Sequence, residues 1–371
     1  MTMKVPLSRP DIAEKDIEAV TRVLATPYLS RWKKLTEFEE RMAAYIGTRY
    51  AVAVSSGTGG LHLCVRSLGI KDGDEVITTP FSFIASANCI LFERARPVFV
   101  DIMPDTLNMD ASKIEGSITP KTKAILAVHV FGHPCEMDEI TRIARKYNLK
   151  VIEDASEAVG AEFKNRKVGR FSNAAAFSFY PNKQITTAEG GVIVTDNKDI
   201  SNLCRSMRNQ GRDDDACDIH HRIGFNYRMN ELSAALGISQ LKRIKGMLKA
   251  RERVADMYSA ELRKVGGIEV PFVSRDVTMS RFVYVIKLAI GYSRKDRDGV
   301  IAYLQSKGIS CGKYFAPIHL QPCYVKMFGY KKGDFPITES VADRVIALPF
   351  YNHLTNEAIR YVCRALKRAL L

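Results

Sequence analysis

The sequence has no apolar run long enough to span a membrane, and its first residues, Met1–Pro6, do not form a charged-then-apolar leader. It also has no compositionally biased segment that would indicate disorder. We therefore expect a soluble, cytoplasmic protein without a membrane partner. At 371 residues, 46% of them hydrophobic, the chain can bury a large core and can form two domains.

Disulfide and metal-binding patterns are missing as well. The eight cysteines include no C-x-x-C pair and no metal-ligand spacing, so we expect reduced thiols, mostly small core residues, and no metal site. No cysteine lies in an evident reactive loop, which argues against cysteine desulfuration. Their positions are Cys64, Cys89, Cys135, Cys204, Cys217, Cys311, Cys323 and Cys363.

Positive charge is in excess, with a formal net charge of +14. The Lys and Arg residues are dispersed among acidic neighbours, and the chain has no basic motif interleaved with aromatic residues. We therefore do not expect a nucleic-acid partner. A positive field of this kind would instead attract anionic substrates such as nucleotide diphosphates and glutamate.

Strand and helix patterns alternate along the first two thirds of the chain. This alternation predicts an α/β fold with a mostly parallel sheet covered by helices on both faces. The expected strands lie near 51–55, 74–79, 97–101, 123–131, 149–154, 174–179 and 191–195.

Helical spacing is also present at 10–24 and 35–46, and Gly47 is expected to end the second of these helices. A change of pattern after Met229 predicts a second, smaller unit. We expect a large α/β domain at 1–245 and a small α+β domain at 246–371. The elements expected there are a long helix at 230–265, a strand at 281–288 and helices near 294–307, 338–347 and 355–369.

Two charged residues follow buried strand patterns in a way that suggests a cofactor. Asp154 closes the run Val151–Asp154, and Lys183 comes shortly after the strand at 174–179. Groups at the carboxyl ends of parallel strands converge on one crevice. Pyridoxal phosphate needs a lysine for its Schiff base and a carboxylate to keep its pyridine nitrogen protonated. The pair is therefore typical of a pyridoxal phosphate site.

The segment Ser55–Gly60 could hold the phosphate of that cofactor. It lies between the strand pattern Ala51–Val54 and a helical pattern, and free N–H groups at a helix N-terminus bind phosphate. Each signal alone has an ordinary alternative: Lys183 as a solvated loop residue, Asp154 as a helix cap, and the glycines as a plain strand-to-helix turn. Their order along the chain favours the cofactor site.

Further motifs occur in a fixed order along the chain: Ser56–Thr58, Gly73–Ile77, Pro97–Asp101, Glu153–Ala155, Phe177–Pro181 with Lys183, Glu189–Gly191, Gly224–Met229, Pro317–Pro322 and Leu348–Pro349. With these motifs the chain resembles a known family, the DegT-like nucleotide-sugar aminotransferases. The resemblance spans essentially the whole sequence, and the segment Ser8–Ser30 is similar to the perosamine-synthase branch of the family. It implies the aspartate-aminotransferase-like fold, type I, in which the N-terminal segment often packs on the small domain.

The resemblance also implies roles for individual residues. Lys183 would form the Schiff base and then move the proton, and Asp154 would pair with the pyridinium nitrogen. Phe83 would stack on the ring, although a core phenylalanine is the alternative. Three residues would hold the phosphate: Thr58, Gly59 and Ser178. Asn226 would reach the phosphate of the neighbouring subunit, which implies a homodimer with shared active sites.

One position departs from the family pattern. Where members often carry Gln or His near the phenolic oxygen of the cofactor, this chain has Glu157. A carboxylate there would be turned away, hold a proton or raise the pKa of the Schiff base. Tyr314 and His319 are candidate contacts for the sugar or its diphosphate. A structural role is the alternative for His319 and is the expected role of His129 and His133.

The implied function is transfer of an amino group from L-glutamate to a keto group of a nucleotide-linked deoxysugar. Two alternatives share the fold or the cofactor. A sugar dehydratase of this family would carry histidine in place of Lys183. A regulator that binds pyridoxal phosphate without turnover would usually carry a DNA-binding module, and none is expected before residue 10.

Overall fold

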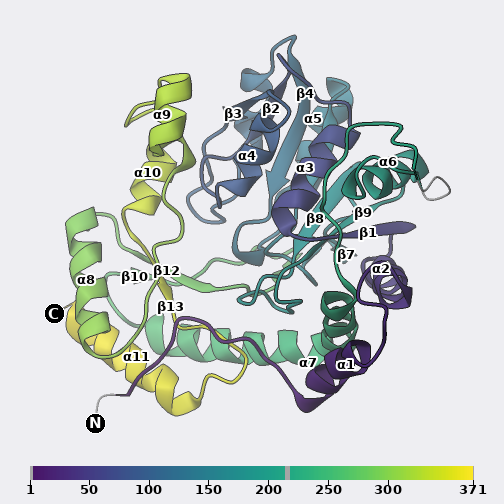
Figure 1. Cartoon of the computed structure of the whole chain (residues 1–371). Coiled ribbons are helices and arrows are strands. Elements are labelled where there is room, and N and C mark those ends of the chain that lie inside the picture. The colour runs from purple at the N-terminus through teal and green to yellow at the C-terminus, as the bar shows by residue number, and fades with distance from the viewer. Residues whose placement is uncertain (1–2, 214–217, 371) are drawn as a thin grey trace.

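A seven-stranded sheet forms the centre of the computed structural model, which describes residues 3–213 and 218–370 (Figure 1). The strand order is β1-β9-β8-β5-β4-β2-β3. Adjacent strands from β8 to β3 are parallel, and only β9 runs antiparallel to its neighbours. This confirms the mostly parallel α/β fold. The strands are β1 (Tyr50–Val54), β2 (Glu75–Thr78), β3 (Arg96–Phe99), β4 (Thr122–Val128), β5 (Lys150–Asp154), β8 (Ala174–Ser178) and β9 (Gly191–Thr195).

Helices cover both faces of this sheet, because its strands carry apolar residues on both sides. One core contains Leu61 and Ile193 and lies beneath α3, and another contains Phe38 and Val192 and lies beneath α2. The helices of this part are α1 (Glu14–Leu24), α2 (Lys33–Ile46), α3 (Gly57–Ser67), α4 (Ala85–Leu91), α5 (Met137–Lys146) and α6 (Lys198–Arg208). As expected, Gly47 ends α2, with a φ of 86°.

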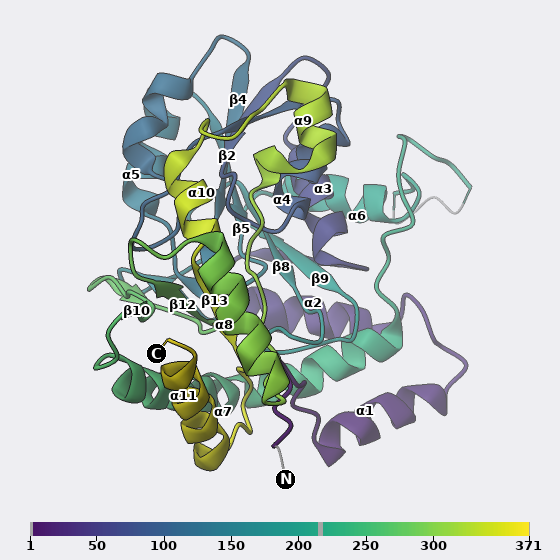
Figure 2. The same cartoon turned by 90° about the vertical axis from the view of Figure 1, so that its left-hand side faces the viewer.

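A second, smaller unit is built on an antiparallel sheet of β10 (Ile268–Glu269), β12 (Tyr284–Leu288) and β13 (Val345–Leu348). Its core also takes in the N-terminal segment: Val5 forms a bridge with Ile309, as the family resemblance implied. Figure 2 shows α8 and α11 beside this sheet. Its helices are α8 (Arg294–Ser306), α9 (Pro322–Phe328), α10 (Pro336–Ala342) and α11 (Asn356–Ala369).

The long helix α7 (Glu231–Leu262) joins the two units and runs beneath both (Figure 1). It packs on α1 and α2 near its start and on α11 near its end. The expected boundary at residue 245 falls inside this continuous helix. The division into domains at 1–245 and 246–371 therefore stays a prediction.

Short elements complete the fold. A small sheet joins β6 (Glu162–Phe163), β7 (Arg166–Lys167) and β11 (Val277–Thr278) across the two units. Single 3-10 turns occur at Ala111–Lys113, Glu115–Ser117, Val130–Gly132 and Ile318–Leu320.

One expected helix is wrong. The segment 338–347 contains the end of α10 and then β13, which pairs with β12 in antiparallel register. The run Val345–Leu348 is short, apolar and fully buried, and such a run does not distinguish a strand from a buried helix by periodicity. Pairing with β12 decides its conformation.

Within residues 3–213 and 218–370, no helix is long and apolar enough to cross a membrane. Seven cysteines of this part are free thiols, whereas Cys217 lies outside the described residues.

Candidate active site

A cavity of about 460 Å³ opens at the carboxyl ends of β5 and β8. Its walls come from three places: the start of α3, the loops that follow β2, β5 and β8, and residues of the small unit. Among the lining residues are Thr58, Phe83, Asp154, Glu157, Ser178, Lys183, Phe282 and Tyr314. The fold therefore brings together most of the residues that the sequence singled out.

Lys183 projects into this cavity from the loop between β8 and β9. Its amine lies 3.9 Å from the ring centroid of Phe282 and 3.6 Å from Oε1 of Glu157. Its side chain is only 11% exposed. Burial lowers the pKa of Lys183 from its ordinary value, although the carboxylates of Glu157 and Asp154 act in the opposite direction. A lysine with a lowered pKa is more readily a neutral nucleophile and base.

The backbone of Lys183 is held by a buried arginine that the sequence analysis missed. Arg251 of α7 donates hydrogen bonds to the carbonyl oxygens of Lys183 and Phe282, each at 3.0 Å. The lysine and the aromatic ring beside its amine are thereby tied to one guanidinium group. No sequence signal distinguishes Arg251 from the other basic residues of α7, because its partners are backbone atoms far away in the chain.

Asp154 ends β5 and lies at the base of the cavity. Its Oδ2 accepts a hydrogen bond of 2.7 Å from the Ser86 hydroxyl, which in turn lies 2.8 Å from the hydroxyl of Ser82. Its Oδ1 accepts the backbone N–H of Ser156 at 3.1 Å. These contacts fix the orientation of the carboxylate. Sequence reasoning did not find Ser82 and Ser86, since they lie on the loop after β2 and the start of α4.

The start of α3 forms a cup beside Ser178. Ser56 caps the helix, and its hydroxyl accepts the N–H of Gly59 at 3.0 Å. The Gly59 amide, expected to hold the phosphate, is therefore used inside the protein, whereas Gly57 and Thr58 line the cavity. Backbone N–H groups in the first turn of a helix have no acceptor within the helix and suit an anion.

Gly57 is needed for the shape of this cup. A Cβ atom at residue 57 would lie 2.7 Å from Cβ of Ser178, which is too close for two carbon atoms. The absence of a side chain therefore allows the helix start to approach the end of β8, so that the free amides and the Ser178 hydroxyl face the same space.

Glu157 faces the cavity and is held in place. Its Oε2 accepts the backbone N–H of Phe131 at 2.8 Å, which leaves Oε1 toward Lys183. Its backbone oxygen accepts a hydrogen bond from Gln184 at 2.7 Å. Burial raises the pKa of Glu157, which the charge of Lys183 only partly opposes. Of the three expectations for this residue, the structure excludes a carboxyl turned away from the site.

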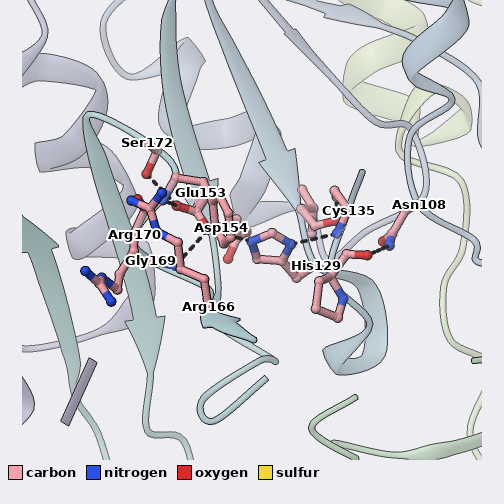
Figure 3. A network of polar contacts seen from close by, with 12 residues as sticks. Asn108, His129, Cys135, Glu153, Asp154, Arg166, Gly169, Arg170 and Ser172 are labelled. Atoms are coloured by element: carbon pink, nitrogen blue, oxygen red, sulfur yellow. Dashed lines mark hydrogen bonds and ion pairs between the residues drawn. The ribbon is translucent and has the colours of Figure 1, made fainter. Parts of the chain in front are cut away.

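A buried network lies next to Asp154 (Figure 3). Glu153 accepts hydrogen bonds from His129, from the backbone N–H groups of Gly169 and Phe171, and from Ser172. Nδ1 of His129 accepts the N–H of Cys135 at 3.1 Å. His129 thus links the ends of β4 and β5 to the loops around them, as a structural role would require.

The remaining predicted site residues lie in different places. Phe83 is 61% exposed at the cavity rim, and Tyr314 lies on the wall formed by the small unit. Asn226 is exposed, and its backbone forms a bridge with Asn209 outside the cavity. His319 is fully buried away from the cavity, and its Nε2 lies 3.0 Å from Oε1 of Glu339. The structure therefore does not bring Asn226 or His319 of the same chain into this site.

The residues present fit pyridoxal phosphate. An amine, an oriented carboxylate and a helix start suited to a phosphate line one cavity, as that cofactor requires. No group of three or more His, Cys, Asp or Glu side chains suited to a metal ion occurs in the described part of the chain. The fold and the site define a pyridoxal-phosphate-dependent transferase.

Comparison with known proteins identifies the family. The sequence profile of the DegT/DnrJ/EryC1/StrS aminotransferase family matches residues 10–367, and the chain belongs to this family. It is 38% identical to GDP-perosamine synthase of Caulobacter vibrioides, over 99% of both chains. It is 37% identical to the spore coat polysaccharide biosynthesis protein SpsC of Bacillus subtilis, over 98% of this chain and 96% of that protein.

A solved structure agrees with the same assignment. The putative sugar aminotransferase Spr1654 of Streptococcus pneumoniae, in its PLP form, superimposes with a TM-score of 0.94. Its sequence is 27% identical, and the match covers 99% of this chain and 98% of that chain. The protein is therefore an aminotransferase of a family whose cofactor is pyridoxal phosphate.

Proposed function

We propose that this enzyme transfers an amino group from L-glutamate to a keto carbon of a nucleotide-linked deoxysugar. The observation that carries the proposal is the placement of the Lys183 amine in a cavity with Asp154 and the start of α3. The similarity to a GDP-perosamine synthase and to a spore coat polysaccharide protein supports an amino-sugar product used in a polysaccharide. A cytoplasmic location stays a prediction.

Bound pyridoxal phosphate supplies an aldehyde that carries the amino group and a ring that withdraws electrons from the reacting carbon. Asp154, oriented by Ser86 and Ser156, would pair with the ring nitrogen. The amides of Gly57 and Thr58 and the hydroxyl of Ser178 would hold the phosphate. Charge-assisted hydrogen bonds of this kind contribute about 1.5–3 kcal/mol each.

Lys183 would hold the cofactor covalently and, once its amine is released, move a proton to or from the substrate carbon. Its burial and its contact with the Phe282 ring keep the amine away from water. Phe83 at the rim would cover the ring, and Tyr314 on the wall formed by the small unit would contact the sugar or its diphosphate. We leave the buried His319 out of the substrate site.

We further propose a homodimer in which Asn226 completes the phosphate site of the neighbouring chain. The exposure of Asn226 outside its own cavity supports this arrangement. Mixing an inactive Lys183→Ala chain with an inactive Asn226→Ala chain should restore activity, because one site of each heterodimer then has both intact residues. Verified heterodimers without any activity would contradict this proposal and place Asn226 outside any active site.

Two experiments test the function itself. Purified enzyme should be yellow, and borohydride should attach the cofactor to the peptide that contains Lys183, as shown by mass spectrometry. A panel of keto-sugars linked to GDP, UDP or dTDP should then be incubated with the enzyme and glutamate. The products should be identified by mass spectrometry. An amino product confirms the transfer. A product that has only lost water would identify a dehydratase, and no turnover with the whole panel would contradict the proposal.

A further inference from the structure

Glu157 and Lys183 form a pair on the cavity wall. Oε1 of Glu157 lies 3.6 Å from Nζ of Lys183, and both side chains are almost fully shielded from water. The distance exceeds the 2.7–3.2 Å of a good hydrogen bond from nitrogen to oxygen. The pair therefore lacks the short, charge-assisted contact that would compensate for burying two opposite charges.

The other contacts of Glu157 do not require a negative charge. Its Oε2 accepts one neutral donor, the backbone N–H of Phe131. A protonated carboxyl group can also accept this bond, and although the bond favours the carboxylate, burial has the larger effect and raises the pKa of Glu157. Oε1 is then free to carry a proton and to point it toward the lysine nitrogen. In a low-dielectric site, an acid and a base so placed neutralise each other more easily than they stay ionised.

Charges on the neighbouring elements act in both directions. Asp154 at the end of β5 favours a charged Lys183, and the Phe282 ring beside the amine does so as well. Arg251 on α7 favours a neutral Lys183 and donates to its carbonyl oxygen. Burial is the largest influence on both members of the pair, and it disfavours their charged forms.

We propose that Glu157 is the proton partner of Lys183: when the lysine amine is free, its ammonium group gives one proton to the Glu157 carboxylate. The N–H bond breaks and an O–H bond forms, which leaves a neutral amine and a neutral carboxylic acid. This rests on the proposed covalent role of Lys183. Its consequence is that a detached Lys183 that gains a proton returns to the neutral amine, the form that can act as a base.

The test uses the full-length enzyme loaded with pyridoxamine phosphate, in which Lys183 is not attached to the cofactor. Infrared spectra of protein with ¹³C-labelled glutamate should contain the C=O band of a protonated carboxylic acid at neutral pH. The band should disappear in Glu157→Gln. It should persist in the matched control Glu189→Gln, which replaces another carboxylate of the same cavity that is exposed.

A second measurement follows the lysine. Acetic anhydride should acetylate Lys183 at neutral pH. The midpoint of the acetylation rate as a function of pH should lie well below about 10.4, the pKa of an ordinary lysine. The rate in Glu157→Gln should stay within about twofold of the wild type, because the proposal gives both proteins a neutral neighbour beside the amine.

Two results would overturn the proposal. Absence of the acid band from the wild-type spectrum would show an ionised Glu157. A Lys183 that is unreactive in the wild type and becomes at least about tenfold more reactive in Glu157→Gln would show an ion pair, since removing the carboxylate would then lower the pKa of the lysine. Neither measurement requires a sugar substrate, so failure here is distinguishable from failure of the proposed aminotransfer.

Discussion

Gly57→Ala is expected to weaken cofactor binding without preventing folding. The added methyl group would lie 2.7 Å from Cβ of Ser178 and 3.1 Å from its hydroxyl oxygen. The start of α3 can avoid this overlap by moving away from β8. To bind the cofactor, the start of α3 must return to its original distance from β8, where the new methyl group overlaps Ser178. Overpacking of this size costs about 1–3 kcal/mol.

That cost corresponds to a dissociation constant raised by roughly 5- to 150-fold, because 1.4 kcal/mol is a factor of ten. The assay is an absorbance titration of pyridoxal phosphate into cofactor-free protein. The matched control is Gly116→Ala, at an exposed glycine where an added methyl group would meet no atom within 4 Å. Its affinity should equal that of the wild type.

The double variant Gly57→Ala, Ser178→Gly provides a stricter test of the same reasoning. Removing the Ser178 side chain removes the atom that the new methyl group would meet, so the effect of Gly57→Ala should be smaller in the Ser178→Gly background. If Gly57→Ala bound pyridoxal phosphate with wild-type affinity, the proposed close contact between residue 57 and Ser178 would be refuted. Equal losses in both backgrounds would show that Ser178 is not the cause.

Three further outcomes are expected. Asp154→Asn should still bind the cofactor but turn over at least about 100-fold more slowly, because a neutral ring withdraws electrons less well; unchanged kinetics would make this residue a structural cap. Glu231→Gln should lower the free energy of unfolding by at least about 2 kcal/mol in denaturant titrations, since this buried carboxylate accepts three backbone N–H groups at the start of α2. An unfolding midpoint equal to that of the wild type would contradict this prediction. Burial raises the pKa of Tyr284 to about 12, so its contribution to stability is full below pH 10 and is lost between about pH 10 and 12. In Tyr284→Phe the free energy of unfolding should therefore fall less steeply over this pH range. An identical fall in the variant would exclude Tyr284 as a cause.

The order of motifs along the chain was enough to predict that Lys183, Asp154 and the start of α3 lie around one cavity. Asp154 ends a strand, Lys183 and the start of α3 follow strands, and in a parallel sheet the ends of such strands meet. Their positions were therefore predictable from local pattern and one topological rule. The same local reasoning predicted α7 almost to its ends, because 32 residues without proline or a turn signal form one helix.

Several supporting residues were not predictable. Ser86, Phe282 and Arg251 carry no signal of their own, and each contacts the site from a segment distant in the sequence. The segment 345–348 has a pattern compatible with helix or strand, and its pairing with β12 makes it a strand. Such features depend on which distant segments contact each other. The periodicity of residues along the chain carries no information about those contacts.

Glu157 illustrates the division between the two kinds of information. The sequence by itself determined that a carboxylate replaces the common Gln or His, and that it lies between Asp154 and Lys183 along the chain. Only the tertiary structure decided that this carboxyl is buried, that Phe131 holds one oxygen and that the other faces Lys183. The reason is physical: the identity of a side chain is local, whereas its solvation and its partners arise from the packing of segments far apart in the sequence.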